Sequence, residues 1–325
     1  MTDATETLGT HSRLEHFPVT FFAIVMGLLG VTLAFHAATP VLGWTAGVSL
    51  VALWGAIGAF VMISAIYLAK VLRYPGAVAG EWNHPVKLAF FPTMTISLLL
   101  LATALREGAP SIAEPLWMIG AVGQGILTIA VVTGWISHRS FEVGHLTPAW
   151  FIPAVGNVIV PVAGARMGYI EISWLFFSVG MMFWGVLLTL VMNRLVFHDP
   201  IPARLFPTMV ILIAPPSVAF VAYVTMSGVV DGFARSLIYV AYLFAALVVA
   251  QVPRLARLPF ALSWWALSFP LAALTIASLL FARLEETAAH QAIGLGVLVI
   301  LSLVVVGLIY RTTLAILRGE ICNPE

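Results

Sequence analysis

The segment PAWFIPAVGNVIVPVAG, residues 148–164, runs through the middle of the chain without a single charged residue. It is nearly long enough to cross the hydrocarbon core of a bilayer, which takes about 20 apolar residues in a helix. Pro153 and Pro161 interrupt it, and Gly156 and Asn157 lie between them. A proline inside a helix removes a backbone hydrogen bond and leaves a carbonyl that lipid cannot satisfy. The segment is therefore typical of a membrane helix buried among other helices.

The composition of the whole chain agrees with this interpretation. Of 325 residues, 61% are hydrophobic and only 9% are charged, whereas soluble domains carry about 25% charged residues. Too little polar surface is left to cover a soluble globule of this size, so the main solvent is lipid. A net charge of +1 gives no reason to expect nucleic acid as a partner. The single cysteine, Cys322, excludes a disulfide within the chain and a thiolate metal site.

Ten apolar segments have the length of membrane helices, so we expect an all-α, polytopic membrane protein. The connections between them are short and leave no room for a soluble domain. We expect a cytosolic tail at 1–17, a ten-helix transmembrane domain at 18–317 and a cytosolic tail at 318–325. The spans are expected at about 18–38, 46–69, 86–105, 115–137, 148–165, 172–197, 207–227, 231–252, 262–282 and 291–317.

Lysine and arginine are distributed unequally between the two sides of these spans. Eleven fall on the side of both termini and only four, Arg106, Arg166, Arg235 and Arg283, fall on the other. Cytosolic loops carry an excess of basic residues. We therefore expect a multi-pass protein of the cell membrane, the inner membrane in a bacterium, with both termini in the cytosol.

Proline divides the spans into two classes. Prolines interior to a span are expected only in odd-numbered spans, at Pro92, Pro153, Pro161, Pro215, Pro216 and Pro270, and the first span instead contains Gly27 and Gly30. Broken helices belong inside a bundle or around a cavity, while unbroken ones can face lipid. The pattern predicts five helical hairpins whose odd-numbered, kinked helices surround a central pore. The alternative is that these prolines are simply tolerated, as they are in many membrane helices.

No aspartate or glutamate falls in the middle of a predicted span. Ionisable residues at that depth usually mark proton relays or ion-coupling sites, so a proton-coupled carrier is disfavoured. The parts of a hydrolase or a metalloenzyme are missing too, so we expect no enzyme, no catalytic residues, no metal and no cofactor. Asn157 has two open interpretations: it packs helices together through hydrogen bonds, or it lines a pathway.

Basic residues lie near the cytosolic starts of the odd-numbered spans, at Lys87, Arg204, Arg254 and Arg257. Helix N-termini carry partial positive charge, and together with these residues they would gather anions at a cytosolic mouth. The competing explanation is topology alone, because the same bias places basic residues in cytosolic loops without any permeant ion.

Five segments that open the odd-numbered spans resemble the slow anion channel and tellurite-resistance/dicarboxylate-transporter family. They are HFPVTFFAIVMGLLG at 16–30, EWNHPVKLAFFPTMT at 81–95, PAWFIPAVGNVIVPVAG at 148–164, FPTMVILIAPPSVA at 206–219 and SWWALSFPLAA at 263–273. The resemblance runs from about residue 14 to 318.

The resemblance implies a homotrimer in which each protomer has its own pore, and a phenylalanine of the ninth helix that plugs it. The matching residue is Phe269, and the proline that follows it, Pro270, would stiffen the gate region. The implied function is an anion channel for chloride, nitrate or similar small anions, which move down their electrochemical gradient. The alternative is a carrier or exporter of oxyanions or four-carbon dicarboxylates, such as tellurite, sulfite or malate.

Overall fold

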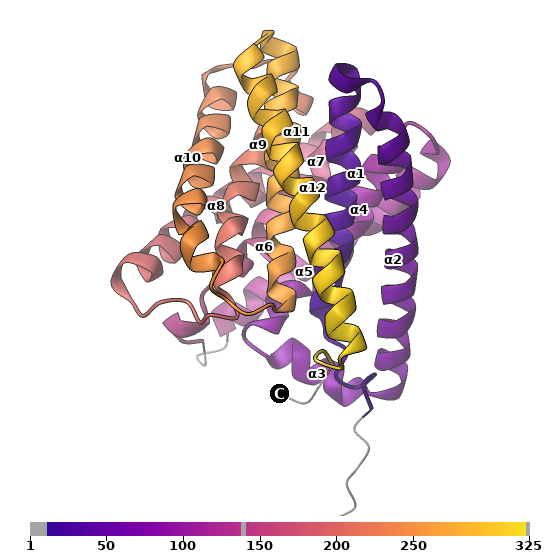
Figure 1. Cartoon of the computed structure of the whole chain (residues 1–325), viewed down its shortest axis with the longest axis vertical. Helices are drawn as coiled ribbons and strands as arrows, with labels where there is room; N and C mark the ends of the chain where they lie inside the picture. The colour runs from indigo at the N-terminus through magenta and orange to yellow at the C-terminus, as the bar shows by residue number, and fades with distance from the viewer. Residues whose placement is uncertain (1–11, 138–140, 323–325) are drawn as a thin grey trace, which may run out of the picture.

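The computed structural model describes residues 12–137 and 141–322, and these residues form helices and turns but no strand. Ten helical spans are long and apolar enough to cross a membrane, which confirms the predicted number. They run side by side along the long axis of the molecule (Figure 1). Residues 1–11 and 323–325 of the two predicted tails lie outside the described residues. The chain is thus an all-α, polytopic membrane protein.

The even-numbered spans are continuous α-helices, whereas the odd-numbered spans mix 3₁₀ and α-helical turns. The even spans are α2 (Thr45–Arg73), α5 (Pro110–Ser137), α8 (Ile170–Phe197), α10 (Gly232–Leu255) and α12 (Ala288–Leu317). The odd spans are η1 (Val19–Phe21) with α1 (Phe22–Leu42); η2 (Lys87–Phe90) with α4 (Thr93–Leu105); η4 (Pro148–Trp150), α6 (Phe151–Val155), η5 (Gly156–Ile159), α7 (Val160–Gly164) and η6 (Ala165–Met167); η7 (Phe206–Ile213) with α9 (Ala214–Ser227); and η8 (Leu262–Leu267) with α11 (Ser268–Glu285). Two short helices, α3 (Pro75–Asn83) and η3 (Val143–His145), lie in connections.

Burial separates the same two classes. In their most apolar windows the odd-numbered spans are 61–94% buried within the protein, and the even-numbered spans are only 17–33% buried. Large apolar side chains on α2, α5, α8, α10 and α12 are exposed along the length of these helices. Such a surface is unfavourable in water and favourable in hydrocarbon. The even-numbered spans therefore provide the lipid-facing exterior.

The odd-numbered spans form a closed ring. α1 packs against α4, α4 against α7, α7 against α9, α9 against α11, and α11 against α1. Each even-numbered helix packs against the odd span that precedes it, as α2 does on α1 and α12 on α11. Both ends of the described chain lie at the same end of this bundle, beside α3 (Figure 1). We call this the terminal end and the other the opposite end.

The six prolines predicted inside odd-numbered spans lie at the starts of α-helices, whereas the kink interpretation requires them in the middle of a helix. Each follows or interrupts 3₁₀ turns, either as the N-cap of an α-helix or within its first three residues: Pro92 caps α4, and the others lie in α6, α7, α9 and α11. At these positions the missing N–H would have had no helical partner anyway. The prolines thus mark the change from 3₁₀ to α geometry.

The prediction that even-numbered spans lack interior proline is wrong for two helices. Pro115 lies inside α5 and Pro253 inside α10, and Pro40 likewise lies inside α1 of the first span. The reason is length, because these helices extend three to five residues beyond the predicted spans. All three prolines fall near a helix end, where one lost hydrogen bond costs less than it does in the middle.

Candidate functional site

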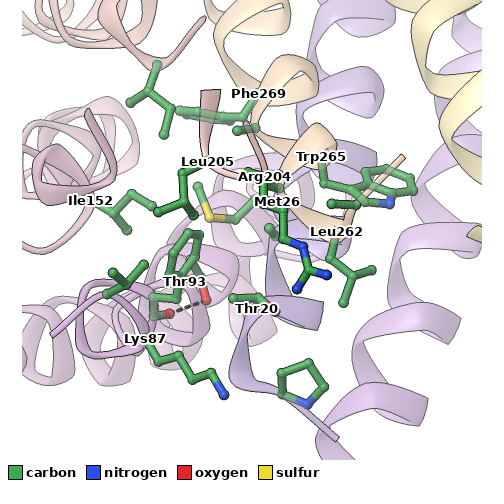
Figure 2. Close-up of a pocket in the computed structure, with 18 of the residues that line it drawn as sticks. Thr20, Met26, Lys87, Thr93, Ile152, Arg204, Leu205, Leu262, Trp265 and Phe269 are labelled. Carbon is green, nitrogen blue, oxygen red and sulfur yellow. Dashed lines mark hydrogen bonds between the residues drawn. The ribbon is translucent and has the colours of Figure 1, made fainter. Parts of the chain in front are cut away.

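A cavity of about 1070 Å³ opens at the terminal end and reaches into the ring of odd-numbered spans. All five of these spans contribute to its wall. Figure 2 shows Lys87 at one end of the cavity and Phe269 at the other, with Arg204 between them. The deeper wall carries apolar or small side chains: Met26, Ile96, Val155, Ile211, Ala214 and Val218. The cavity therefore narrows from a charged entrance to an uncharged inner end.

Phe269 is anchored through its neighbours in the sequence, and its partly buried side chain packs against the hydrophobic core. Ser268 and Pro270 on either side are buried, and the Ser268 hydroxyl donates a hydrogen bond to the Trp265 carbonyl at 2.6 Å. The Trp265 indole N–H in turn donates to Thr312 of α12 at 2.9 Å. The Phe269 ring is partly exposed, and no ring contact with another described aromatic residue is recorded for it. The backbone is thus anchored while the ring borders open space.

Two glycines of α1 allow α11 to approach closely. A Cβ atom on Gly27 would lie 2.3 Å from the Ser268 hydroxyl oxygen, which is far inside contact distance. A Cβ on Gly30 would lie 2.9 Å from the Cβ of Ala272. Neither glycine is among the residues that line the cavity. The structure thus places Gly27 and Gly30 in the packing between α1 and α11.

A second cavity of about 460 Å³ lies at the opposite end of the same ring. The two cavities approach each other closely inside the protein. On span 5 the wall of the first includes Ile159 and the wall of the second begins at Val162; on span 7 the corresponding residues are Val218 and Val221. Three residues of helix rise about 4.5 Å. On spans 1, 3 and 9 the two walls are six or seven residues apart, so a closed stretch of the ring, bordered on one side by Phe269, separates the two cavities.

Only two of the four basic residues predicted at the entrance line the cavity, namely Lys87 and Arg204. The Arg254 guanidinium instead lies over the ring of Phe206, 4.2 Å from its centroid. Arg257 is exposed and is not a lining residue. Carboxylates border the entrance too, at Glu15, Glu81 and Glu320. One of them, Glu81, is neutralised by Lys70 at 3.1 Å.

The predicted proline and glycine residues divide between the cavity wall and the packing behind it. Gly156, Pro215 and Pro270 line the cavity, while Gly27, Gly30, Pro92, Pro153, Pro161 and Pro216 do not. Asn157 does not line it either. Its amide donates to Thr128 at 2.9 Å and to the Ala154 carbonyl at 2.7 Å, and the residue is 1% exposed.

The hydrogen bonds around Asn157 serve the break in span 5. The carbonyl of Pro153 accepts a hydrogen bond from the Gln124 amide at 3.1 Å and one from the Thr128 hydroxyl at 2.8 Å, whose single proton is shared with the Gln124 backbone carbonyl at 2.7 Å. Gln124 also accepts from Thr95 at 2.7 Å, so α4, α5 and span 5 are joined. This network satisfies a carbonyl that lipid could not. Of its two open interpretations, the structure therefore favours packing for Asn157.

A buried ion pair at the terminal end was missed by sequence reasoning, which treated Lys70 only as a marker of topology. Lys70 is 1% exposed and Glu81 is 6% exposed. Besides pairing with Glu81, Lys70 donates to the Phe17 carbonyl at 2.9 Å, and the Tyr67 hydroxyl donates to Glu81 at 2.9 Å. Glu81 also accepts from the backbone N–H of Val19 at 3.2 Å. The cluster thus fixes the start of span 1 to α2 and α3.

Cys322 lies beside this entrance and lines the cavity. Burial raises the pKa of its thiol, and the nearby positive charges of Arg13 and Lys70 oppose that shift. A thiol with a raised pKa holds less of the reactive thiolate at neutral pH. The raised pKa therefore gives no support for a nucleophilic role of Cys322. Among the described residues, no group of three or more metal-ligating side chains is found.

Comparison with known proteins places this architecture among anion transport proteins. Residues 16–313 match the SLAC1 family model, which is described as a voltage-dependent anion channel. An uncharacterized transporter of Methanocaldococcus jannaschii is 26% identical over 287 residues, which cover 80% of this chain and 83% of that protein. The Tellurite resistance protein TehA homolog of Haemophilus influenzae is 28% identical over 265 residues, with 79% of each chain covered.

Plant proteins match over most of this chain but only part of their own. The Guard cell S-type anion channel SLAC1 of Arabidopsis thaliana is 26% identical over 282 residues, which cover 83% of this chain and 50% of that protein. This chain therefore spans about half the length of its plant relative. The similarity lies in the region that contains the ten spans.

Proposed function

This chain belongs to the SLAC1 family of voltage-dependent anion channels, and from that premise we propose that it is an anion-selective channel gated by Phe269. Small monovalent anions such as chloride and nitrate would pass through the ring of odd-numbered spans, down their electrochemical gradient. The observation that carries this proposal is the pair of cavities. All five odd-numbered spans contribute to both walls, and the closed stretch between the cavities, which Phe269 borders, is three to seven residues long on each span.

The proposed gate works by steric block and dewetting. An aromatic ring in a narrow, uncharged passage leaves no room for an ion and offers it no ligand to replace its water. Phe269 has the properties that such a gate needs, because its backbone is anchored and its ring borders open space. A rotation of the ring toward the first cavity would join the two cavities.

Selectivity for anions would arise at the terminal end, which we assign to the cytosol. Lys87 and Arg204 line that entrance, and the odd-numbered spans begin there with their positive dipole ends. A negative membrane potential drives anions outward, by about 2.3 kcal/mol per elementary charge per 100 mV. Anion efflux is therefore the expected direction at rest. We also propose a homotrimer with one pore per protomer, which native mass spectrometry tests.

A carrier for oxyanions or four-carbon dicarboxylates is the second candidate, and the size of the first cavity favours it. A volume of about 1070 Å³ is ample for such a substrate. Against it, the wall between the charged entrance and Phe269 carries no carboxylate among its described residues, so nothing there could couple transport to protons.

The two candidates are separated by an electrical measurement on the purified chain in planar bilayers. A channel gives a current whose reversal potential follows the chloride gradient and which does not saturate at low anion concentration. A carrier leaves the bilayer electrically silent and takes up labelled malate with saturation in vesicles. Bilayers without current, together with saturable malate uptake, would contradict the channel proposal and support the carrier.

A further inference from the structure

The cavity at the opposite end carries charges that the channel proposal does not use. Its wall includes Arg106, Arg166 and Arg283, which come from the ends of three different odd-numbered spans. Arg106 follows α4, Arg166 lies in η6, and Arg283 lies in the last turn of α11. The chain thus gathers three of its four basic residues on this side into one concave site.

Two of the three arginines have no recorded partner. Arg106 pairs with Glu107 at 2.7 Å. For Arg166 and Arg283, no hydrogen bond and no ion pair with another described residue is recorded, and both side chains are exposed. Arg106 and Arg283 nevertheless lie close enough to Arg166 for their positive charges to repel its own, and the carboxylate of Glu107 in the same wall opposes this repulsion only in part. Like charges held near each other in a cavity favour an anion between them.

The dipoles of the helix ends work against anion binding at this cavity. The odd-numbered spans finish at this cavity, so their carbonyl ends point toward it and carry partial negative charge. Glu286, which follows α11, adds a formal negative charge to the wall. Without Arg166 and Arg283 this mouth would repel anions. The positive charges of Arg166 and Arg283 make the mouth attractive to anions instead. Neither guanidinium donates a hydrogen bond to a described helix-end carbonyl, so both remain available to a ligand.

We propose that the cavity at the opposite end is a binding site for a small carboxylate or oxyanion, held between Arg166 and Arg283. A guanidinium group presents two parallel N–H donors that match the two oxygens of a carboxylate, whereas chloride offers only one point of contact. The site prefers planar or tetrahedral oxyanions to chloride for this reason. It is separate from Phe269, and its occupation requires no flux through the closed stretch between the cavities.

Binding of malonate to the purified full chain in lipid nanodiscs, measured by calorimetry, tests the site. We expect saturable binding of malonate and none of malonamide, which has the same size and no charge. R166Q and R283Q should each weaken malonate binding at least about tenfold, because each removes a charge-assisted pair of hydrogen bonds. R166K keeps the charge but loses the two-pronged donor, so it should weaken binding less than R166Q.

R235Q is the matched control. Arg235 lies on the same side of the protein and pairs with Glu285, but it does not line the cavity. Its loss changes the surface charge equally and should leave malonate binding unchanged. Equal binding by wild type and by the double variant R166Q/R283Q would overturn the proposal, as would an equal loss in R235Q or equal binding of malonamide. Malonate binding without any anion current would refute the channel and leave this site intact.

Discussion

Gly30 of α1 lies against Phe269 of α11 where the two helices pack together. A Cβ atom on Gly30 would lie 3.6 Å from Cδ2 of the Phe269 ring and 2.9 Å from the Cβ of Ala272. Position 30 therefore has no room for a side chain, and α1 and α11 meet closely at the level of the proposed gate. Two residues far apart in the sequence, one on the first span and one on the ninth, are thus brought side by side.

Replacing Phe269 by alanine should increase the anion current. The smaller side chain removes the ring that borders the closed stretch between the cavities, and a barrier lower by about 1.4 kcal/mol corresponds to about tenfold in rate. We expect an increase of at least about that size in planar bilayers. Phe197→Ala is the control, because Phe197 is 75% exposed on the exterior of α8. Equal currents in wild type and Phe269→Ala would show that the Phe269 ring is not the gate.

Gly30→Ala should destabilise the protein by about 1–3 kcal/mol, the usual cost of overpacking. The added methyl group would contact Ala272 too closely, and α1 and α11 must move apart to accept it. Thermal unfolding in detergent measures the effect. Gly55→Ala on α2 is the control, because its Cβ would meet nothing within 4 Å. Alanine favours a helix over glycine by about 1 kcal/mol, so the control should be neutral or stabilising.

Arg204→Gln should lower the chloride conductance, with a larger effect at low ionic strength. Arg204 lines the entrance of the first cavity, and its charge raises the local anion concentration. Charges are screened over about 30 Å in 0.01 M salt but over only about 3 Å in 1 M salt. Arg257→Gln removes the same charge outside the cavity and should have little effect. A loss that does not depend on salt would point to a structural role for Arg204.

Thr128→Val should destabilise the protein by about 1–3 kcal/mol, because it removes one of the two donors to the Pro153 carbonyl. The substitution keeps the shape of the side chain. Thr189→Val in α8 is a close control, since the Thr189 hydroxyl donates only to the Gly185 carbonyl of its own helix. Similar unfolding temperatures for both variants would show that the network around span 5 adds little to stability.

Lys70→Met should cost about 3–5 kcal/mol, the usual penalty for leaving a buried charge without its partner. Glu81 would keep its hydrogen bonds from Tyr67 and Val19 but would lose the only ammonium group within pairing distance among the described residues. The double variant Lys70→Met/Glu81→Gln should recover much of that loss in unfolding experiments. A double variant as unstable as the sum of the two single variants would contradict this view of the pair.

The sequence alone showed that the protein lies in a membrane, and it gave the order of the membrane spans. An apolar run of sufficient length can satisfy its backbone in lipid only as a helix, so length and composition are enough to count ten spans. The resemblance of the five segments that open the odd-numbered spans likewise pointed to the family that the comparison shows. Phe269 entered through that resemblance, since nothing in its local sequence distinguishes it from the other phenylalanines.

Only the tertiary structure decided which side chains share a cavity. Lys87 and Arg204 line one, whereas Arg254, equally basic and equally near a span, lies on Phe206 instead. Arg166 and Arg283 are more than a hundred residues apart in the sequence and meet at the same mouth. Periodicity and hydropathy depend on neighbours along the chain. The direction of a side chain at the end of a helix depends on how each helix is rotated about its axis and packed against its neighbours. No local sequence pattern predicts that arrangement.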